Sequence, residues 1–277
     1  MLTFVKAQFL ERSSGMNIGV SSACFFPCDT IESLNICADC GFGIAEIFAN
    51  THSELMGEYL KDVKKITSDR NIRITSIHPF TSGYEYILFF AGYDKRIDDA
   101  IEYYKNYFEC AAALGAKYVI FHGDNRRAPF VGVERYAEIF SRLDEASKPF
   151  GVRVAQENVS TSHIGSPENI RKLRSLLPDI QFTFDIKQAC RGGFDPFDML
   201  DAMGSNVRHV HLNDWNGEDC ALPCKGECDL KGLAAKLDSV NYGGDYIIEV
   251  YRRNFENCRD LHTSKTEFLK LFDKGTV

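Results

Sequence analysis

The 277-residue sequence lacks the marks of a membrane protein, an exported protein or a nucleic-acid-binding protein. No apolar run approaches the ~20 residues that span a bilayer, so we expect a soluble protein. The first fifteen residues contain no apolar core of about 7–15 residues flanked by small side chains, which argues against a secretory signal. A formal net charge of -7 disfavours broad binding to phosphate backbones or anionic lipids. We therefore expect neither a membrane nor a nucleic acid as a partner.

The chain also lacks strong cysteine and glycine motifs. Its ten cysteines are spread through a large core-forming chain without an export signal, which favours reduced thiols and a cytoplasmic location. Neither the CxxC at Cys37–Cys40 nor the three cysteines between residues 220 and 228 match a strong zinc or cluster template. The glycines at Gly41–Gly43 precede an expected strand instead of following one, so the dinucleotide fingerprint is missing. We expect no nicotinamide or flavin cofactor.

No proline-rich, serine-rich or single-charge block divides the chain into two parts. Length alone does not decide the number of domains, because α/β barrels commonly form one domain of about 250 residues. We predict one domain over residues 16–277, preceded by an amino-terminal extension of residues 1–15.

Short apolar runs alternate with amphipathic stretches eight times, which predicts a parallel sheet with helices between its strands. Eight such units close into a (β/α)₈ TIM barrel of the α/β class, although a doubly wound open sheet is the alternative. The expected strands are Asn17–Ser21, Ile44–Phe48, Ile72–His78, Tyr118–His122, Val152–Glu157, Gln181–Asp185, Val207–Leu212 and Tyr246–Val250.

Residues typical of helix ends agree with this division. Ser166 and Pro167 supply a cap and a proline at a first helical position, and Asp94 and Asp229 are candidate caps. The glycines expected to end helices are Gly41, Gly115 and Gly151.

Four residues of metal-binding type stand at the ends of the last four expected strands: Glu157, Asp185, His211 and Glu249. Their spacing approximates the ~30 residues of one strand-plus-helix unit. Because all strands of a parallel barrel end at one rim, the four side chains are predicted to meet there. Taken singly, a strand-end aspartate is also a helix cap and a histidine is also a hydrogen-bonded core residue. Three carboxylates and one imidazole suit a divalent ion but do not name it. Our expectation is Mn²⁺, with Zn²⁺, Mg²⁺ and Co²⁺ as alternatives.

The segments around these residues also carry a family resemblance. They read AQEN at Glu157, FTFDI at Asp185, HVHLND at His211, KGECDL from Lys225 and IIEVY at Glu249. In this order and spacing they resemble the sugar phosphate isomerase/epimerase superfamily of xylose-isomerase-like barrels, which also contains the AP endonucleases (family 2).

The resemblance implies that Glu157, Asp185, His211 and Glu249 hold one divalent ion, and that Glu157 and Glu249 also move the proton. The chemistry gives an independent reason. A metal bound to a carbonyl and an adjacent hydroxyl acidifies the C–H between them and stabilises the enediolate, and carboxylates on either side of that carbon serve as base and acid. We therefore predict isomerisation or epimerisation through a cis-enediolate.

Three further residues are assigned to substrate binding. His78 and His122 end the third and fourth expected strands, and the resemblance implies that they bind substrate oxygens or, as in the AP endonucleases, a second metal. A buried structural imidazole is the alternative for each. Gln188 stands where the endonuclease branch has a ligand histidine, so a three-metal phosphodiesterase site is incomplete. Its amide still donates and accepts hydrogen bonds.

The sequence adds weaker candidates at the same rim. Trp215, the single tryptophan, offers an apolar wall for a sugar ring, and Arg252 offers bidentate donors to a phosphate or carboxylate. Solvated surface charge is the alternative for the basic residues predicted nearby, which are Arg126, Arg127, Lys187, Arg191, Lys225 and Arg253.

The predicted function is a metal-dependent isomerase or epimerase of a small sugar, polyol ketone or sugar phosphate. An inosose dehydratase-like lyase is one alternative, because it uses the same enolate and then expels a hydroxyl. An AP endonuclease-like phosphodiesterase and a barrel that binds sugar or metal without turnover are the others. Barrels of this kind often pair, so a homo-oligomer is a further expectation by analogy.

Overall fold

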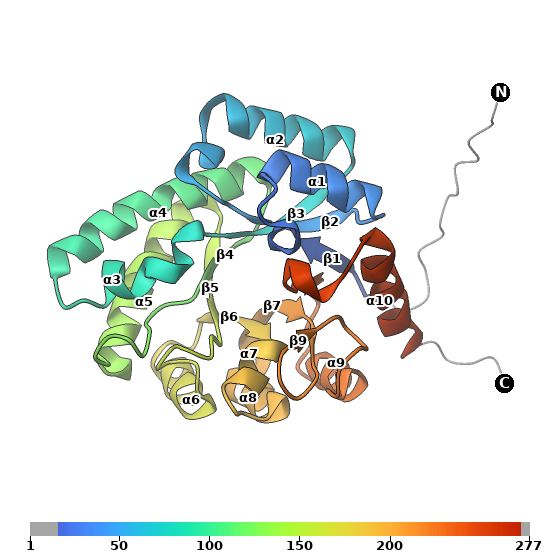
Figure 1. Cartoon of the computed structure of the whole chain (residues 1–277). Helices are drawn as coiled ribbons and strands as arrows, with labels where there is room; N and C mark the ends of the chain where they lie inside the picture. Colours follow the sequence, from blue (N-terminus) through green and yellow to red (C-terminus); the bar gives the residue numbers. More distant parts are fainter. Residues whose placement is uncertain (1–15, 273–277) are drawn as a thin grey trace, which may run out of the picture.

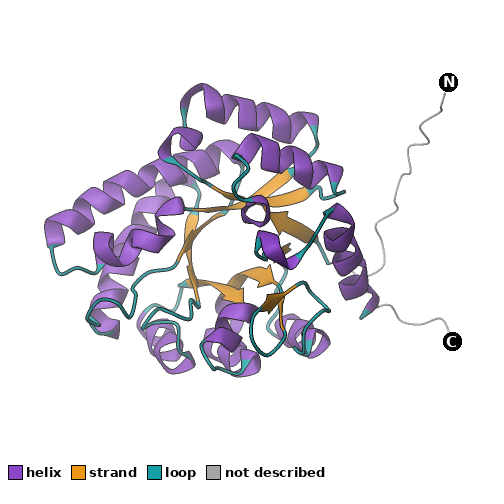
Figure 2. Ribbon diagram, in the orientation of Figure 1, coloured by secondary structure: helices purple, strands orange, loops and turns teal. Residues whose placement is uncertain are grey.

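The protein is described here by a computed structural model covering residues 16–272. The predicted extension, residues 1–15, lies outside the described residues. Eight parallel strands form a closed barrel in the order β1-β10-β7-β6-β5-β4-β3-β2, and helices surround it (Figures 1 and 2). The predicted (β/α)₈ TIM barrel is therefore confirmed, and the doubly wound open sheet is excluded.

The strands fall where the sequence predicts them, within one or two residues at each end. The barrel strands are β1 Ile18–Ser21, β2 Ile44–Phe48, β3 Arg73–His78, β4 Tyr118–Phe121, β5 Arg153–Glu157, β6 Gln181–Asp185, β7 Val207–Leu212 and β10 Tyr246–Ile248. A separate antiparallel pair, β8 Asp214–Trp215 and β9 Cys220–Ala221, lies in the segment after β7.

Helices connect the strands. They are α1 Thr30–Asp39, α2 Gly57–Asp69, α3 Glu85–Phe89, α4 Asp94–Leu114, α5 Val133–Ser147, α6 Pro167–Leu176, α7 Ile186–Arg191, α8 Pro196–Met203, α9 Leu230–Ser239 and α10 Cys258–Lys270. Short 3₁₀ turns follow several strands and helices. Within residues 16–272, none of the helices combines the length and apolarity needed to cross a bilayer.

Most predicted helix ends are confirmed. Ser166 accepts a hydrogen bond from Asn169 at the start of α6, and Asp229 caps α9 through the Gly232 backbone N–H. Gly115 ends α4 in the left-handed conformation that glycine favours. The prediction for Asp94 is wrong, because Tyr93 occupies the capping position and Asp94 is the first helical residue. The Asp94 carboxylate instead pairs with Arg135 on α5.

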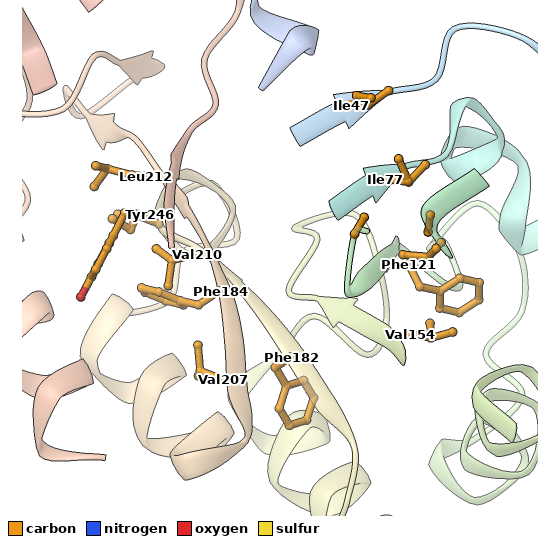
Figure 3. Close-up of a cluster of buried hydrophobic side chains, with 14 of the residues drawn as sticks. Ile47, Ile77, Phe121, Val154, Phe182, Phe184, Val207, Val210, Leu212 and Tyr246 are labelled. Carbon is orange, nitrogen blue, oxygen red and sulfur yellow. The ribbon is translucent and has the colours of Figure 1, made fainter. Parts of the chain in front are cut away.

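The period-two alternation of β-strands separates an apolar outer face from a polar interior. Outward side chains such as Phe182, Phe184 and Val210 are buried in the layer between strands and helices (Figure 3). The alternate positions on the same strands point into the barrel. On β6 and β7 these positions carry Asp185 and His211, which are direct partners in the strand register.

One expectation about the cysteines is wrong. Cys40, just after α1, and Cys258, at the start of α10, form a disulfide across a sequence separation of 218 residues. The closed barrel brings these two helices together, because β1 pairs with β10, and the two Cα atoms lie 5.0 Å apart. Sequence spacing gave no sign of this contact. The other eight cysteines are free.

We predict that thiol titration in denaturant without reductant detects eight thiols per chain, and ten after reduction. The double variant C40S/C258S should lose roughly 2–5 kcal/mol of unfolding free energy, because the bridge restricts the unfolded chain. Urea unfolding monitored by circular dichroism measures the loss. Detection of ten thiols in the unreduced protein would contradict the disulfide.

Candidate metal centre and active site

Four side chains from adjacent strand ends converge inside the mouth of the barrel. Glu157 ends β5, Asp185 ends β6, His211 lies near the end of β7, and Glu249 directly follows β10. His211 Nδ1 lies 3.7 Å from Glu157 Oε1, 3.5 Å from Asp185 Oδ2 and 3.3 Å from Glu249 Oε2. One donor atom from each of the four residues lies within 4.8 Å of all the others. The structure thus brings together the four residues that the sequence singled out.

The arrangement fits a divalent ion. Four ligands at about 2.1 Å from a central ion in tetrahedral geometry stand about 3.4 Å apart, which agrees with the distances from His211 Nδ1. This nitrogen is buried and has no hydrogen-bond partner among the described residues, although buried polar atoms are normally satisfied. Hard carboxylate oxygens and one imidazole suit Mn²⁺, Mg²⁺ or Zn²⁺ and do not distinguish among them.

Glu46 contacts the ring nitrogen of His211 that faces away from the other three carboxylates. This carboxylate, fully buried on β2, lies with Oε2 3.2 Å from His211 Nε2. The carboxylate also accepts hydrogen bonds from Ser21 and Ser76 and lies 3.0 Å from His209 Nε2. A proton on His211 Nε2 bonded to Glu46 leaves the lone pair of Nδ1 directed at the other ligands. Metal-binding histidines commonly have such a carboxylate behind them.

Neighbouring cationic groups keep two of the proposed ligands, Glu157 and Asp185, ionised. Burial by itself raises the pKa of the Glu157 carboxyl, but His122 and His211 outweigh it and hold the pKa well below its usual range. For Asp185, burial is opposed chiefly by the Lys187 ammonium, and the pKa is lowered. Burial lowers the pKa of His211, while Glu249 and Glu46 raise it well above its ordinary value. A cation bound here would therefore meet the ionised carboxylates of Glu157 and Asp185 and would displace a proton from His211.

Lys187 lies inside this site and not on the rim surface. Its ammonium donates hydrogen bonds to Asp185 Oδ2 and to Glu249 Oε2, the latter at 2.5 Å. The residue is 3% exposed. The six-residue helix α7, which begins directly after Asp185, carries the side chain back over the strand ends.

His78 and His122 form a second group with Glu157. The Nε2 atoms of the two histidines lie 3.0 Å apart, and His122 Nε2 lies 3.0 Å from Glu157 Oε2. Behind them, Glu85 of α3 accepts hydrogen bonds from the backbone N–H groups of His122 and Gly123 at 2.7 and 2.6 Å. Its carboxylate thus holds the end of β4 in place.

A cavity of about 220 Å³ opens directly above these groups. Its lining includes Phe48, His78, His122, Glu157, Lys187, Gln188, Glu249 and Tyr251. The volume lies below the range of about 300–1,000 Å³ typical of drug-sized ligands, which favours a small substrate. Gln188 Oε1 accepts hydrogen bonds from the backbone and side chain of Ser160. This orients the amide group at the cavity wall.

Two other predicted contacts lie outside this cavity. The Arg252 guanidinium donates to the backbone oxygens of Phe255 and Glu256 and stacks on the Phe255 ring. Trp215 lies on β8, where Arg191 covers its ring. Arg191 also donates to the Tyr251 hydroxyl, so this arginine links the tryptophan to the cavity wall.

A larger cavity of about 800 Å³ lies at the amino-terminal end of the strands. Its lining includes Asn17 before β1 and the Arg73–Asp245 ion pair, but none of the carboxylate and histidine groups described above. Active sites of TIM barrels lie at the opposite, carboxyl-terminal face, so we assign the site to the smaller cavity.

Sequence reasoning missed Glu46, Glu85 and the inward position of Lys187. Glu46 carried a signal, because a glutamate stands in the apolar run of β2, IAEIF. Glu85 carried none, because it lies in a short helix whose packing against the end of β4 depends on tertiary structure.

The comparisons with known proteins agree with the fold. Residues 34–271 match the family model described as xylose isomerase-like TIM barrel, so the chain belongs to this family. An inosose isomerase from Bacillus velezensis is 23% identical over 88% of this chain and 93% of its own length.

Solved structures show the same fold. A 3-keto-D-glucoside 4-epimerase from E. coli superposes with a TM-score of 0.73 at 18% identity, over 92% of this chain and 99% of that one. A D-psicose 3-epimerase from Clostridium cellulolyticum H10 superposes with a TM-score of 0.77 at 13% identity, over 93% and 99%.

Glu85 gives a pH-dependent prediction. Burial raises the pKa of its carboxyl to about 7, so its contribution to stability is full below about pH 4.5 and is lost as the pH rises through 7. Glutamine does not ionise, and E85Q should lack this loss. The unfolding free energy of the wild type minus that of E85Q should therefore fall by roughly 3 kcal/mol between pH 4.5 and 7.5 and then level off. Urea titrations at several pH values measure it. A difference that rises or stays constant would contradict the assignment.

Proposed function

We propose that the protein is a divalent-metal-dependent isomerase or epimerase of a small sugar, polyol ketone or sugar phosphate. The observation that carries the proposal is the convergence of Glu157, Asp185, His211 and Glu249 around the unsatisfied nitrogen of His211. Membership in the xylose isomerase-like family and the small cavity above these groups support it.

Two of the four proposed ligands, Glu157 and Glu249, would also act on the substrate. A divalent ion held here would polarise a carbonyl and its neighbouring hydroxyl and stabilise the enediolate charge. Glu157 and Glu249 reach the cavity from strands on different sides of His211, which suits removal of a proton on one side of a carbon and its return on the other. Return to the opposite face gives the epimer, and return to the neighbouring carbon gives the isomer.

His78, His122 and Gln188 would bind the remaining substrate oxygens. All three line the cavity, and the two imidazoles lie beside Glu157. In our proposal they orient the sugar, so that the reacting C–H points at one carboxylate. Trp215 and Arg252 lie outside the cavity and would contact only a substrate that extends beyond it.

A lyase is the second candidate function. The relative named inosose isomerase supports a cyclic polyol ketone as a substrate class. An enolate of such a ketone expels a β-hydroxyl as water, instead of regaining a proton, when a nearby acid protonates that hydroxyl. His78 and His122 line the cavity and would serve as this acid. Loss of one water from the product mass would identify the lyase.

We predict that E249Q strongly slows proton exchange. With Mn²⁺ and a panel of ketohexoses, inososes and ketose phosphates, the wild type should incorporate solvent deuterium into one substrate. E249Q should reduce that rate by ~10²-fold or more, because a general base is lost. NMR or mass spectrometry measures the incorporation. E256Q, an exposed change in the same loop, is the matched control and should retain the rate.

Chelation provides the second arm of this experiment. Removal of the ion with EDTA should stop exchange in the wild type, and added Mn²⁺ should restore it. Turnover of the wild type with complete retention of the original hydrogen would overturn the proposal. Undiminished exchange in E249Q, or in the wild type with EDTA, would also overturn it.

A further inference from the structure

Lys187 shares two ligand atoms with the proposed metal site. Its Nζ donates to Asp185 Oδ2 and Glu249 Oε2, and these are the same two oxygens that face His211 Nδ1 at 3.5 and 3.3 Å. The remaining oxygen of Asp185 already accepts hydrogen bonds from the Gln188 backbone and the Asn213 side chain. Asp185 therefore has one oxygen for both cations.

The ammonium is a built part of the site. The Lys187 side chain is 4% exposed, and the Asp185 side chain is fully buried. The backbone N–H of Lys187 is itself held by Asn213 Oδ1 at 2.7 Å, which fixes the start of the side chain. A buried cation requires paired anions, and here the pair consists of two of the four proposed metal ligands.

We propose that Lys187 is a positioning residue that competes with the divalent ion for Asp185 and Glu249. The inference rests on the proposed metal site and deepens it. Without an ion, the ammonium offsets the repulsion between the two buried carboxylates and keeps the ligands assembled. When an ion binds, the ammonium either leaves these oxygens or remains within a few ångströms of a second positive charge, and both cases weaken binding.

The consequence is a site of reduced affinity that is already shaped for its ion. Methionine at position 187 has a similar length and no charge. K187M should therefore bind divalent ions more tightly than the wild type, by tenfold or more. In EDTA, K187M should melt at a lower temperature than the wild type, because the carboxylates lose their counter-charge, and saturating ion should close that gap. If Lys187 had only a packing role, the ion would not remove the difference in melting temperature between K187M and the wild type.

Isothermal titration of Mn²⁺ and of Zn²⁺ into the apo proteins tests the proposal, with melting curves in EDTA and in excess ion. The variants are K187M and K187Q, and K231M is the control, because it removes an exposed lysine from α9 and changes the net charge equally. We expect tighter binding in both Lys187 variants and unchanged affinity in K231M. If the wild type binds the ion and the Lys187 variants bind it equally or more weakly, the competition by Lys187 is refuted. The proposed metal site itself is then retained.

Three other outcomes would also support or overturn the proposal. If the wild type binds neither ion, the proposed metal site itself fails. If both Lys187 variants fold only when ion is present, the ammonium and the ion substitute for one another, which supports the proposal. If both variants fail to fold with and without ion, Lys187 has a structural role alone and the proposal is overturned.

Discussion

The structure around the barrel mouth depends on the compensation of buried negative charge. Glu46, Glu157 and Asp185 are almost fully buried, and Glu249 is only slightly exposed. Ionised carboxylates removed from water are costly unless cations or hydrogen-bond donors face them. His211 lies between Glu46 on one side and the three proposed ligands on the other. Its orientation therefore decides whether these charges form one site.

The sequence predicted the fold and the convergence of four metal-binding types of residue, for a local physical reason. Short β-branched runs that end in Glu157, Asp185 or His211 show both where a strand lies and which residue comes to its carboxyl end. In a parallel barrel all such ends share a rim. The spacing of these residues along the sequence was therefore enough to predict that their side chains meet.

What could not be predicted depends on contacts across the barrel or on the direction of a side chain. The Cys40–Cys258 disulfide requires the closure of β1 on β10. Lys187 was expected among the basic residues around the rim, either as an anion-binding group or as solvated surface charge. The turn into α7 instead directs its ammonium at Asp185 and Glu249. Arg252 follows a strand as predicted, yet its guanidinium is engaged by the backbone of the next loop.

Membership in the family defines the barrel, whereas the substrate depends on the loops around the cavity. In this chain Gln188, His78 and His122 line the cavity together with Glu157 and Glu249. Arg191 links the Trp215 and Tyr251 rings. These residues, and not the four ligands, would select among sugars of similar chemistry.

The most direct measurement of the central claim is anomalous diffraction at the manganese edge from crystals soaked in Mn²⁺. The expected result is a peak within about 2.0–2.4 Å of Glu157 Oε1, Asp185 Oδ2, His211 Nδ1 and Glu249 Oε2. A peak confined to the His78–His122 pair, or no peak near His211 at saturating Mn²⁺, would contradict the claim.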